Sequence, residues 1–231
     1  MKKASVFLDI DNTLLDFDRA ERLALIKTFD GLGISWDEDM LKRYNAINIS
    51  KWELLELGVL TRAQVLSGRF EQLFKERGIV GDGEQTQRIY EDHLSQGHFF
   101  MPGAVELLEA LHEKYDLYLA SNGNAHTQDG RLKSAGIGRY CKDIFISEQI
   151  GAEKPGRVYF ERCFSRIDGF DPSRAIMVGD SLTSDIRGGI NAGIKTCWFN
   201  FRRRPAREDI KPDYTVYALE EIPPLLEKVF L

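Results

Sequence analysis

The chain has 231 residues, of which 43% are hydrophobic, 29% charged and 11% aromatic, as expected for a soluble globular protein with a sizeable core. The formal net charge of −5 provides no broad basic field, so binding to a polymeric nucleic acid is not expected. The cysteines, Cys141, Cys163 and Cys197, lie far apart without metal-ligand spacing, which favours reduced thiols and a cytoplasmic location. No apolar run reaches the roughly 18 residues of a membrane span.

Residues 5–15, near the N-terminus, read SVFLDIDNTLL. An apolar run here leads into two aspartates. This run predicts a buried strand that ends at Asp9 and Asp11, where unpaired charge is costly. The hydrophobic spacing then becomes helical. Helices are predicted over residues 18–32, 36–57, 61–77 and 83–97.

The ends of these helices carry recognisable turn and capping signals. Glycines that we expect in the left-handed capping conformation are Gly33, Gly58, Gly78 and Gly97. Pairs with the spacing of a capping box are Ser35 with Glu38 and Thr61 with Gln64. Helices joined by such short links predict a small four-helix bundle.

From Pro102 onward, apolar strands alternate with helices. The predicted strands are LYLAS, IFIS, AIMVG, TCWFN and YTV. This alternation predicts an α/β fold, a doubly wound, mostly parallel Rossmann-like sheet that the first strand joins. The sheet domain is then expected over 1–15 and 100–231, with the helical bundle of 16–99 inserted as a second domain.

Polar residues follow several predicted strands at their carboxyl ends, where open parallel sheets bind ligands. They are Asp9, Asp11, Ser121, Asn122, Lys154, Asp180 and Asp185. Clustered carboxylates repel one another unless a cation neutralises them, and oxygen ligands without Cys or His favour Mg²⁺. A lysine, a hydroxyl and backbone amides suit a phosphate dianion. The set therefore indicates phosphoryl transfer, in which one aspartate attacks phosphorus and a second acts as acid and base.

Four stretches in this order resemble the motifs of the haloacid-dehalogenase-like hydrolase superfamily. They are DIDNT, the Ser121 hydroxyl after a hydrophobic strand, Lys154 with Pro155, and GDSLTSD, between residues 9 and 185. The inserted helices resemble the cap domain of that family, which closes over the active site. One departure is Asn12, where many members have glycine. Asparagine tolerates unusual backbone angles, so we expect little loss.

The resemblance implies a role for each motif residue. Asp9 would be the nucleophile and Asp11 the general acid and base. Mg²⁺ would lie between Asp9, the backbone carbonyl of Asp11 and Asp180. The expected ligands of the phosphoryl oxygens are Ser121, Asn122 and Lys154, with Asp185 positioning Lys154 or a metal-bound water.

Two further stretches, YNAINISKWELLELGVLTRAQVLSGRF and GGINAGIKTCWFN, resemble the house-cleaning pyrimidine 5′-nucleotidases. Tyr44, Asn48 and Trp52 fall on one stripe of a predicted helix, with Asn45 beside it. Either the aromatic residues pack the bundle and the asparagines are exposed, or the asparagines contact a base or sugar while an aromatic ring stacks on it.

The expected function is a Mg²⁺-dependent phosphatase, monomeric or homodimeric, acting on small phosphorylated metabolites, chiefly nucleoside 5′-monophosphates with pyrimidine preference. Alternatives are a sugar-phosphate phosphatase, a phosphomutase of the β-phosphoglucomutase type, and a catalytically inactive binding protein on the same fold. A dehalogenase is disfavoured because that branch resembles DxY, whereas this chain has Asp11.

Overall fold

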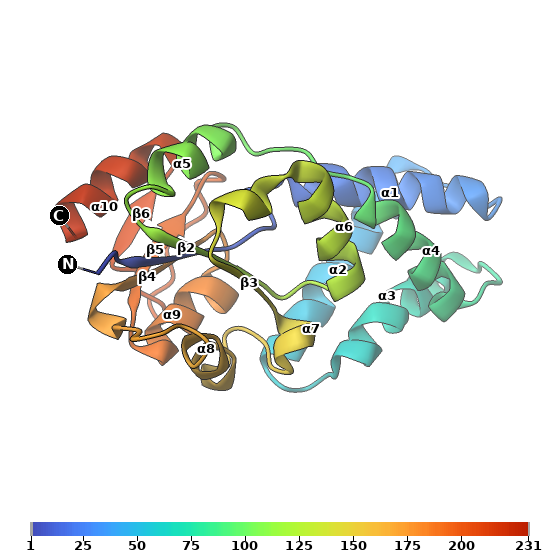
Figure 1. The fold of residues 1–231 in the computed structure, drawn as a ribbon. Coiled ribbons are helices and arrows are strands. Elements are labelled where there is room, and N and C mark those ends of the chain that lie inside the picture. The colour runs from blue at the N-terminus through green and yellow to red at the C-terminus, as the bar shows by residue number, and fades with distance from the viewer. Residues whose placement is uncertain (1, 231) are drawn as a thin grey trace. The chain divides into compact units, whose positions relative to one another are not determined.

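The computed structural model of the chain describes residues 2–230. The chain divides into two compact units, Met1–Phe17 with His98–Leu231 and Asp18–Gly97. The first contains the strands and the second contains most of four helices (Figure 1). Across residues 2–230, no helix is both long enough and apolar enough to cross a membrane.

The strands of the first unit form a parallel sheet. They are β1 (Ser5–Leu8), β2 (Asp116–Ser121), β3 (Asp143–Ile146), β4 (Ala175–Gly179), β5 (Lys195–Phe199) and β6 (Tyr214–Val216). The six-stranded sheet has the order β3-β2-β1-β4-β5-β6, and each neighbouring pair is parallel. The predicted α/β fold is confirmed. Since the chain proceeds outward from β1 on both sides, the boundary of β1 and β4 is the switch point where such sheets bind ligands.

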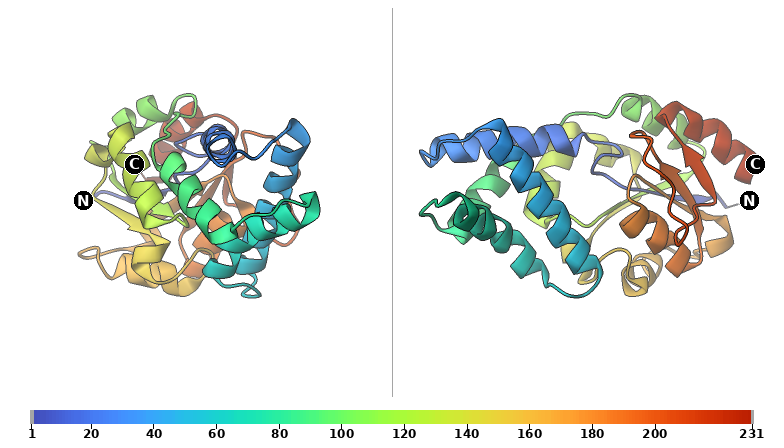
Figure 2. Two further views of the ribbon diagram at one scale, coloured as in Figure 1. Left: turned by 90° about the vertical axis from the view of Figure 1, so that its right-hand side faces the viewer. Right: turned by 180° about the vertical axis from the view of Figure 1, so that it is seen from behind.

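Helices cover both faces of this sheet. They are α5 (Ala104–Leu111), α6 (Ala125–Ala135), α7 (Ser147–Ile150), α8 (Arg157–Phe164), α9 (Arg187–Ala192) and α10 (Ile222–Phe230). In Figure 1, α5 and α10 lie on one side of the strands and α8 and α9 on the other, and Figure 2 shows the same layers from behind.

The alternation of side chains along β1 explains these two layers. Successive residues of a strand point to opposite faces. Val6 and Leu8 belong to a buried cluster with Leu108 of α5 and Leu226 of α10. Phe7 belongs to a separate cluster with side chains of α8 and β3. Buried on both faces, β1 reads as a continuous apolar run and brings Asp9 to the carboxyl edge of the sheet.

The helices of the second unit follow the predicted pattern, and each bound lies within two residues of its prediction. They are α1 (Phe17–Gly31), α2 (Glu38–Glu56), α3 (Arg62–Arg77) and α4 (Gly83–Ser95). The Thr61–Gln64 capping box and the left-handed conformations of Gly33, Gly58 and Gly78 are confirmed.

Two capping predictions were wrong. The α2 helix is capped by Asp37, whose carboxylate accepts a hydrogen bond from the Met40 N–H at 2.7 Å, and not by Ser35. Aspartate is as good an N-cap as serine. Gly97 is not left-handed either, because α4 ends at Ser95 and its C-cap is Gln96 in a right-handed conformation, with the Gln96 N–H donating to the carbonyls of His93 and Leu94.

A buried polar cluster joins the helices of the second unit. Glu21 of α1 accepts hydrogen bonds from the amide nitrogens of Asn48 at 2.7 Å and Asn45 at 3.1 Å. Asn48 Oδ1 in turn accepts from Arg69 Nη1 at 2.7 Å, and Gln87 Oε1 accepts from Arg69 Nη2 at 2.9 Å. Glu21 and Arg69 are only 3% and 4% exposed. Asn48 thus links a buried carboxylate to a buried guanidinium.

Glu21 makes the stability of this unit depend on pH. Burial raises the pKa of Glu21 from 4.5 to about 7, against the attraction of Arg69. Since the folded state holds the proton more tightly, the stabilising contribution is complete below about pH 4.5 and disappears as the pH rises through about 7. We expect the free energy of unfolding to fall by about 3 kcal/mol more in wild type than in Glu21→Gln over this range, measured by urea titration. The exposed Glu53→Gln variant should follow wild type, and equal slopes for wild type and Glu21→Gln would contradict this assignment.

Candidate active site

Two aspartates flank the switch point of the sheet. Asp9 follows β1 and Asp180 follows β4. The Asp9 N–H donates to the carbonyl of Val178 at 2.9 Å, which ties the end of β1 to β4, and Asp9 is buried. The Asp180 carbonyl accepts from the indole N–H of Trp198 at 2.9 Å. Hydrogen bonds from the sheet to the backbone of each residue therefore hold both aspartates at this edge.

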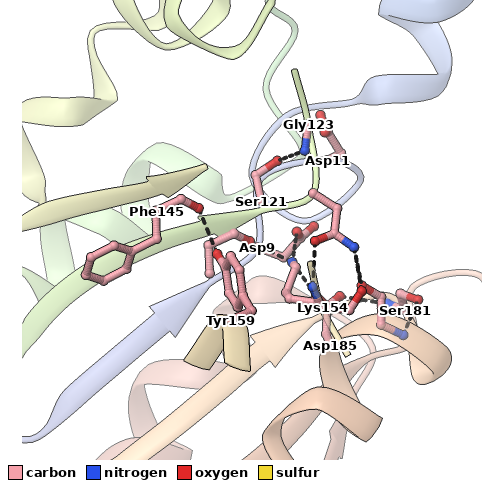
Figure 3. Close-up of polar contacts among 12 residues, drawn as sticks. Asp9, Asp11, Ser121, Gly123, Phe145, Lys154, Tyr159, Ser181 and Asp185 are labelled. Carbon is pink, nitrogen blue, oxygen red and sulfur yellow. Dashed lines mark hydrogen bonds and ion pairs between the residues drawn. The ribbon is translucent and has the colours of Figure 1, made fainter. Parts of the chain in front are cut away.

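Lys154 lies at the centre of the site (Figure 3), 2% exposed. Its ammonium donates to Asp9 Oδ1 at 2.7 Å, to Asp185 Oδ1 at 2.7 Å and to the carbonyl of Ala120 at 2.6 Å. Three acceptors match the three donors of a lysine ammonium. Burial opposes this charge, but the attraction of Asp185 and Asp9 prevails and raises the pKa of Lys154 above its usual value.

The predicted phosphate ligand Asn122 holds the segment that carries this lysine. Asn122 Oδ1 accepts from the Lys154 N–H at 2.8 Å, and its amide nitrogen donates to the Lys154 carbonyl at 2.7 Å. The side chain therefore pairs with both backbone groups of Lys154. Contact of Asn122 with a phosphoryl oxygen stays a prediction.

Three carboxylates meet at this edge of the sheet, with oxygens of Asp9, Asp180 and Asp185 all within 4.8 Å of one another. Burial and the negative charge of Asp185 raise the pKa of Asp9 well above its usual range, and the same two causes raise the pKa of Asp180 to about 7. Such shifts mark an excess of negative charge that a bound cation would relieve. Carboxylate oxygens without sulfur or nitrogen suit a hard divalent ion such as Mg²⁺. The Asp11 carboxylate does not belong to this group, and the predicted contact of its backbone carbonyl with the metal stays a prediction.

Gly179, the last residue of β4, makes room for Asp185. A Cβ at position 179 would lie 2.1 Å from Asp185 Oδ2 and 2.3 Å from its Cγ. Asp185 Oδ2 also accepts from the Ser181 N–H at 3.0 Å. Asp185 Oδ1 accepts from Lys154, so both carboxylate oxygens of Asp185 are held, and glycine at 179 is required for the observed position of this carboxylate.

Ser121 ends β2 with a buried hydroxyl that accepts two hydrogen bonds. The donors are the Gly123 N–H at 2.9 Å and Gln128 Nε2 at 2.8 Å. A hydroxyl has two acceptor lone pairs and one donor. The Ser121 O–H can therefore donate a hydrogen bond to a ligand oxygen, as a phosphate site requires.

Asp11 lies on the side of the site formed by α6. Its carboxylate contacts Gln128 and Arg131 of that helix, two residues that the sequence analysis did not identify. The available signal was a glutamine and an arginine on the inward face of a helix that follows the Ser121 stretch. Asn12 has φ 61°, and its Oδ1 accepts from the Phe17 N–H at 3.1 Å, so the expected tolerance of an unusual backbone angle is confirmed.

The residues predicted for substrate contact in the second unit occupy different environments. Tyr44 is fully buried against Phe70, with ring centroids 5.0 Å apart. Asn45 and Asn48 share Glu21, as described above. Trp52 is half-buried beneath the guanidinium of Arg62 at 5.6 Å. Tyr44 thus packs the bundle, and contact of these four residues with substrate stays a prediction.

The candidate site thus consists of carboxylates and a lysine gathered at the switch point of a parallel α/β sheet. The family model for haloacid dehalogenase-like hydrolases matches residues 4–193. The chain belongs to this family, which confirms the predicted resemblance and the expectation of an enzyme.

Relatives with similar sequences extend along nearly the whole chain. The HAD-hydrolase YfnB of Bacillus subtilis is 40% identical, over 94% of this chain and 93% of its own. The pyrimidine 5′-nucleotidase PynA of Streptococcus pneumoniae is 37% identical, over 98% and 96%. The pyrimidine 5′-nucleotidase YjjG of Escherichia coli is 34% identical, over 99% and 100%. A crystal structure of YfnB bound to magnesium matches with a TM-score of 0.94 at 39% identity, over 98% of this chain and 99% of that one.

Proposed function

We propose that the protein is a Mg²⁺-dependent phosphatase that hydrolyses small phosphomonoesters. Its preferred substrates are nucleoside 5′-monophosphates, and among these it prefers pyrimidine nucleotides. The observation that carries this proposal is one buried ammonium, Lys154, shared by Asp9 and Asp185 beside Asp180. A charged lysine here orients Asp9 and adds positive charge where a phosphoryl group would bind.

The carboxylates of Asp9 and Asp180 and the backbone carbonyl of Asp11 would hold Mg²⁺. When bound, the ion neutralises the carboxylates and the phosphoryl oxygens. The acidic cluster and the magnesium-bound structure of the relative YfnB support this assignment.

The side chains of the site account for two successive displacements at phosphorus. An Asp9 oxygen attacks phosphorus to form an aspartyl-phosphate while the bond to the substrate oxygen breaks, and Asp11 gives a proton to that leaving oxygen. Water then attacks the aspartyl-phosphate, Asp11 takes its proton, and inorganic phosphate leaves with Asp9 restored. Ser121 donates to a phosphoryl oxygen throughout, and Lys154 stays charged between Asp9 and Asp185.

The pyrimidine preference is supported by the relatives PynA and YjjG, which are named for that activity. The test is phosphate release from nucleoside 5′-monophosphates and sugar phosphates, with Mg²⁺ and with EDTA. We expect turnover with Mg²⁺ that is highest for pyrimidine nucleotides, its loss in EDTA and its return when Mg²⁺ is restored. Turnover of sugar phosphates alone would discard the nucleotide assignment. No turnover of any substrate would favour a phosphomutase or a binding protein.

A further inference from the structure

Gln128 and Arg131 of α6 form a buried polar pair beside Asp11. Gln128 is 1% exposed and Arg131 is fully buried. A buried guanidinium is costly unless charged and polar partners surround it. Its ion-pair partner is the carboxylate of Asp11, and the ring of Phe17 lies 5.6 Å from the guanidinium carbon.

The hydrogen bonds of this pair determine the orientation of the Gln128 side-chain amide. Arg131 Nη1 donates to Gln128 Oε1 at 2.9 Å, which leaves the amide nitrogen directed at the other two partners. Gln128 Nε2 lies 2.7 Å from Asp11 Oδ2 and 2.8 Å from Ser121 Oγ. Arg131 contacts the other carboxylate oxygen, Oδ1. Both oxygens of Asp11 are therefore held, and one amide group connects Asp11 to Ser121.

The backbone at Gly123 also lies close to the Gln128 side chain. A Cβ at position 123 would lie 2.5 Å from Gln128 Cγ and 2.6 Å from Nε2. The glycine of the Ser121-Asn122-Gly123 turn thus leaves the space in which the Gln128 side chain lies.

We propose that Gln128 and Arg131 are positioning residues that hold the Asp11 carboxylate at a fixed position relative to Ser121. The proton of Asp11 is then delivered to the leaving oxygen of a phosphoryl group that is bound at Ser121. This inference rests on the proposed function, in which Asp11 is the acid and base. Each carboxylate oxygen has a second lone pair, so Asp11 can gain or lose a proton while both contacts persist.

The test compares two substrates that need the proton to different extents. The alkoxide of a nucleoside 5′-monophosphate leaves poorly without a proton, whereas the phenolate of p-nitrophenyl phosphate leaves well without one. We expect Gln128→Met and Arg131→Met to lower kcat/KM for uridine 5′-monophosphate by at least about 10-fold more than for p-nitrophenyl phosphate. Arg131→Lys, which keeps the charge, should recover part of the loss.

The ratio of the two kcat/KM values does not depend on the fraction of enzyme that is folded, so it distinguishes positioning from a structural role. Equal losses for both substrates would overturn the inference. If Arg131→Met does not fold, Gln128→Met decides the question. The matched control is Lys133→Met, which removes an exposed cation of the same helix and should leave both values and their ratio unchanged.

Asp11→Asn separates failure of this inference from failure of the proposed function. It should show the largest selective loss with uridine 5′-monophosphate. If Asp11→Asn is selective and the α6 variants are not, only the positioning role is wrong. If Asp11→Asn itself shows no selectivity, or wild type hydrolyses neither substrate, the proposed function fails and the inference fails with it.

Discussion

Asp9→Asn is expected to reduce phosphate release by roughly 10⁴-fold or more, because a neutral amide cannot replace an ionised nucleophile. The fold should persist, since the remaining carbonyl oxygen can still accept from Lys154 Nζ, which lies 2.7 Å from Asp9 Oδ1. Burial and Asp185 raise the pKa of Asp9, so the charge of Asp9 is costly in the folded state. Removing it leaves Lys154 paired with Asp185 alone, and we expect a melting temperature equal to or above that of wild type.

The measurement combines steady-state phosphate release at saturating Mg²⁺ with thermal unfolding. The matched control is Asp129→Asn, which removes an exposed carboxylate of α6 and should leave both quantities unchanged. Activity of Asp9→Asn within tenfold of wild type would show that another group attacks phosphorus. A large loss of stability would instead show that the Asp9 charge supports the fold.

Lys154→Met is expected to lose both activity and stability, whereas Asp9→Asn should lose activity alone. The substitution leaves Asp9 and Asp185 as two buried carboxylates without the ammonium that both contact. Removing one partner of a buried ion pair costs about 3–5 kcal/mol, because the other charge remains buried. Urea unfolding in EDTA measures this cost, and the exposed Lys142→Met should show almost none.

A second substitution tests the cause of that destabilisation. Adding Asp185→Asn to Lys154→Met removes one of the two uncompensated charges, so the double variant should be more stable than Lys154→Met alone. A loss below about 1 kcal/mol for Lys154→Met, or a double variant that is less stable still, would mean that mutual repulsion of these carboxylates does not govern stability here.

Together these variants separate two demands on the same residues. The site holds more negative charge than Lys154 neutralises, as the raised pKa values of Asp9 and Asp180 indicate. Such an arrangement is unfavourable for folding and favourable for binding a divalent cation and a phosphoryl group.

Local chemistry explains which parts of the fold were predictable. Continuous apolar runs identified the strands and the period-3.6 pattern identified the helices, and turn residues such as Gly78 and Thr61 marked helix ends correctly. The errors, at Ser35 and Gly97, occurred where another nearby residue, Asp37 or Gln96, could also begin or end the helix. Choices of that kind depend on the path of the adjoining chain, which a local pattern does not contain.

The sequence by itself determined the fold class and the family, because candidate motif residues such as Asp9, Ser121 and Asp180 lie at the carboxyl ends of apolar runs that form parallel strands. Only the tertiary structure decided which side chains contact one another. Arg131 and Asp11 are 120 residues apart, and Asn48 and Glu21 are 27 apart, yet each pair is in contact. A buried polar side chain is stabilised by whichever partner the packing brings to it, and no spacing along the chain encodes that partner.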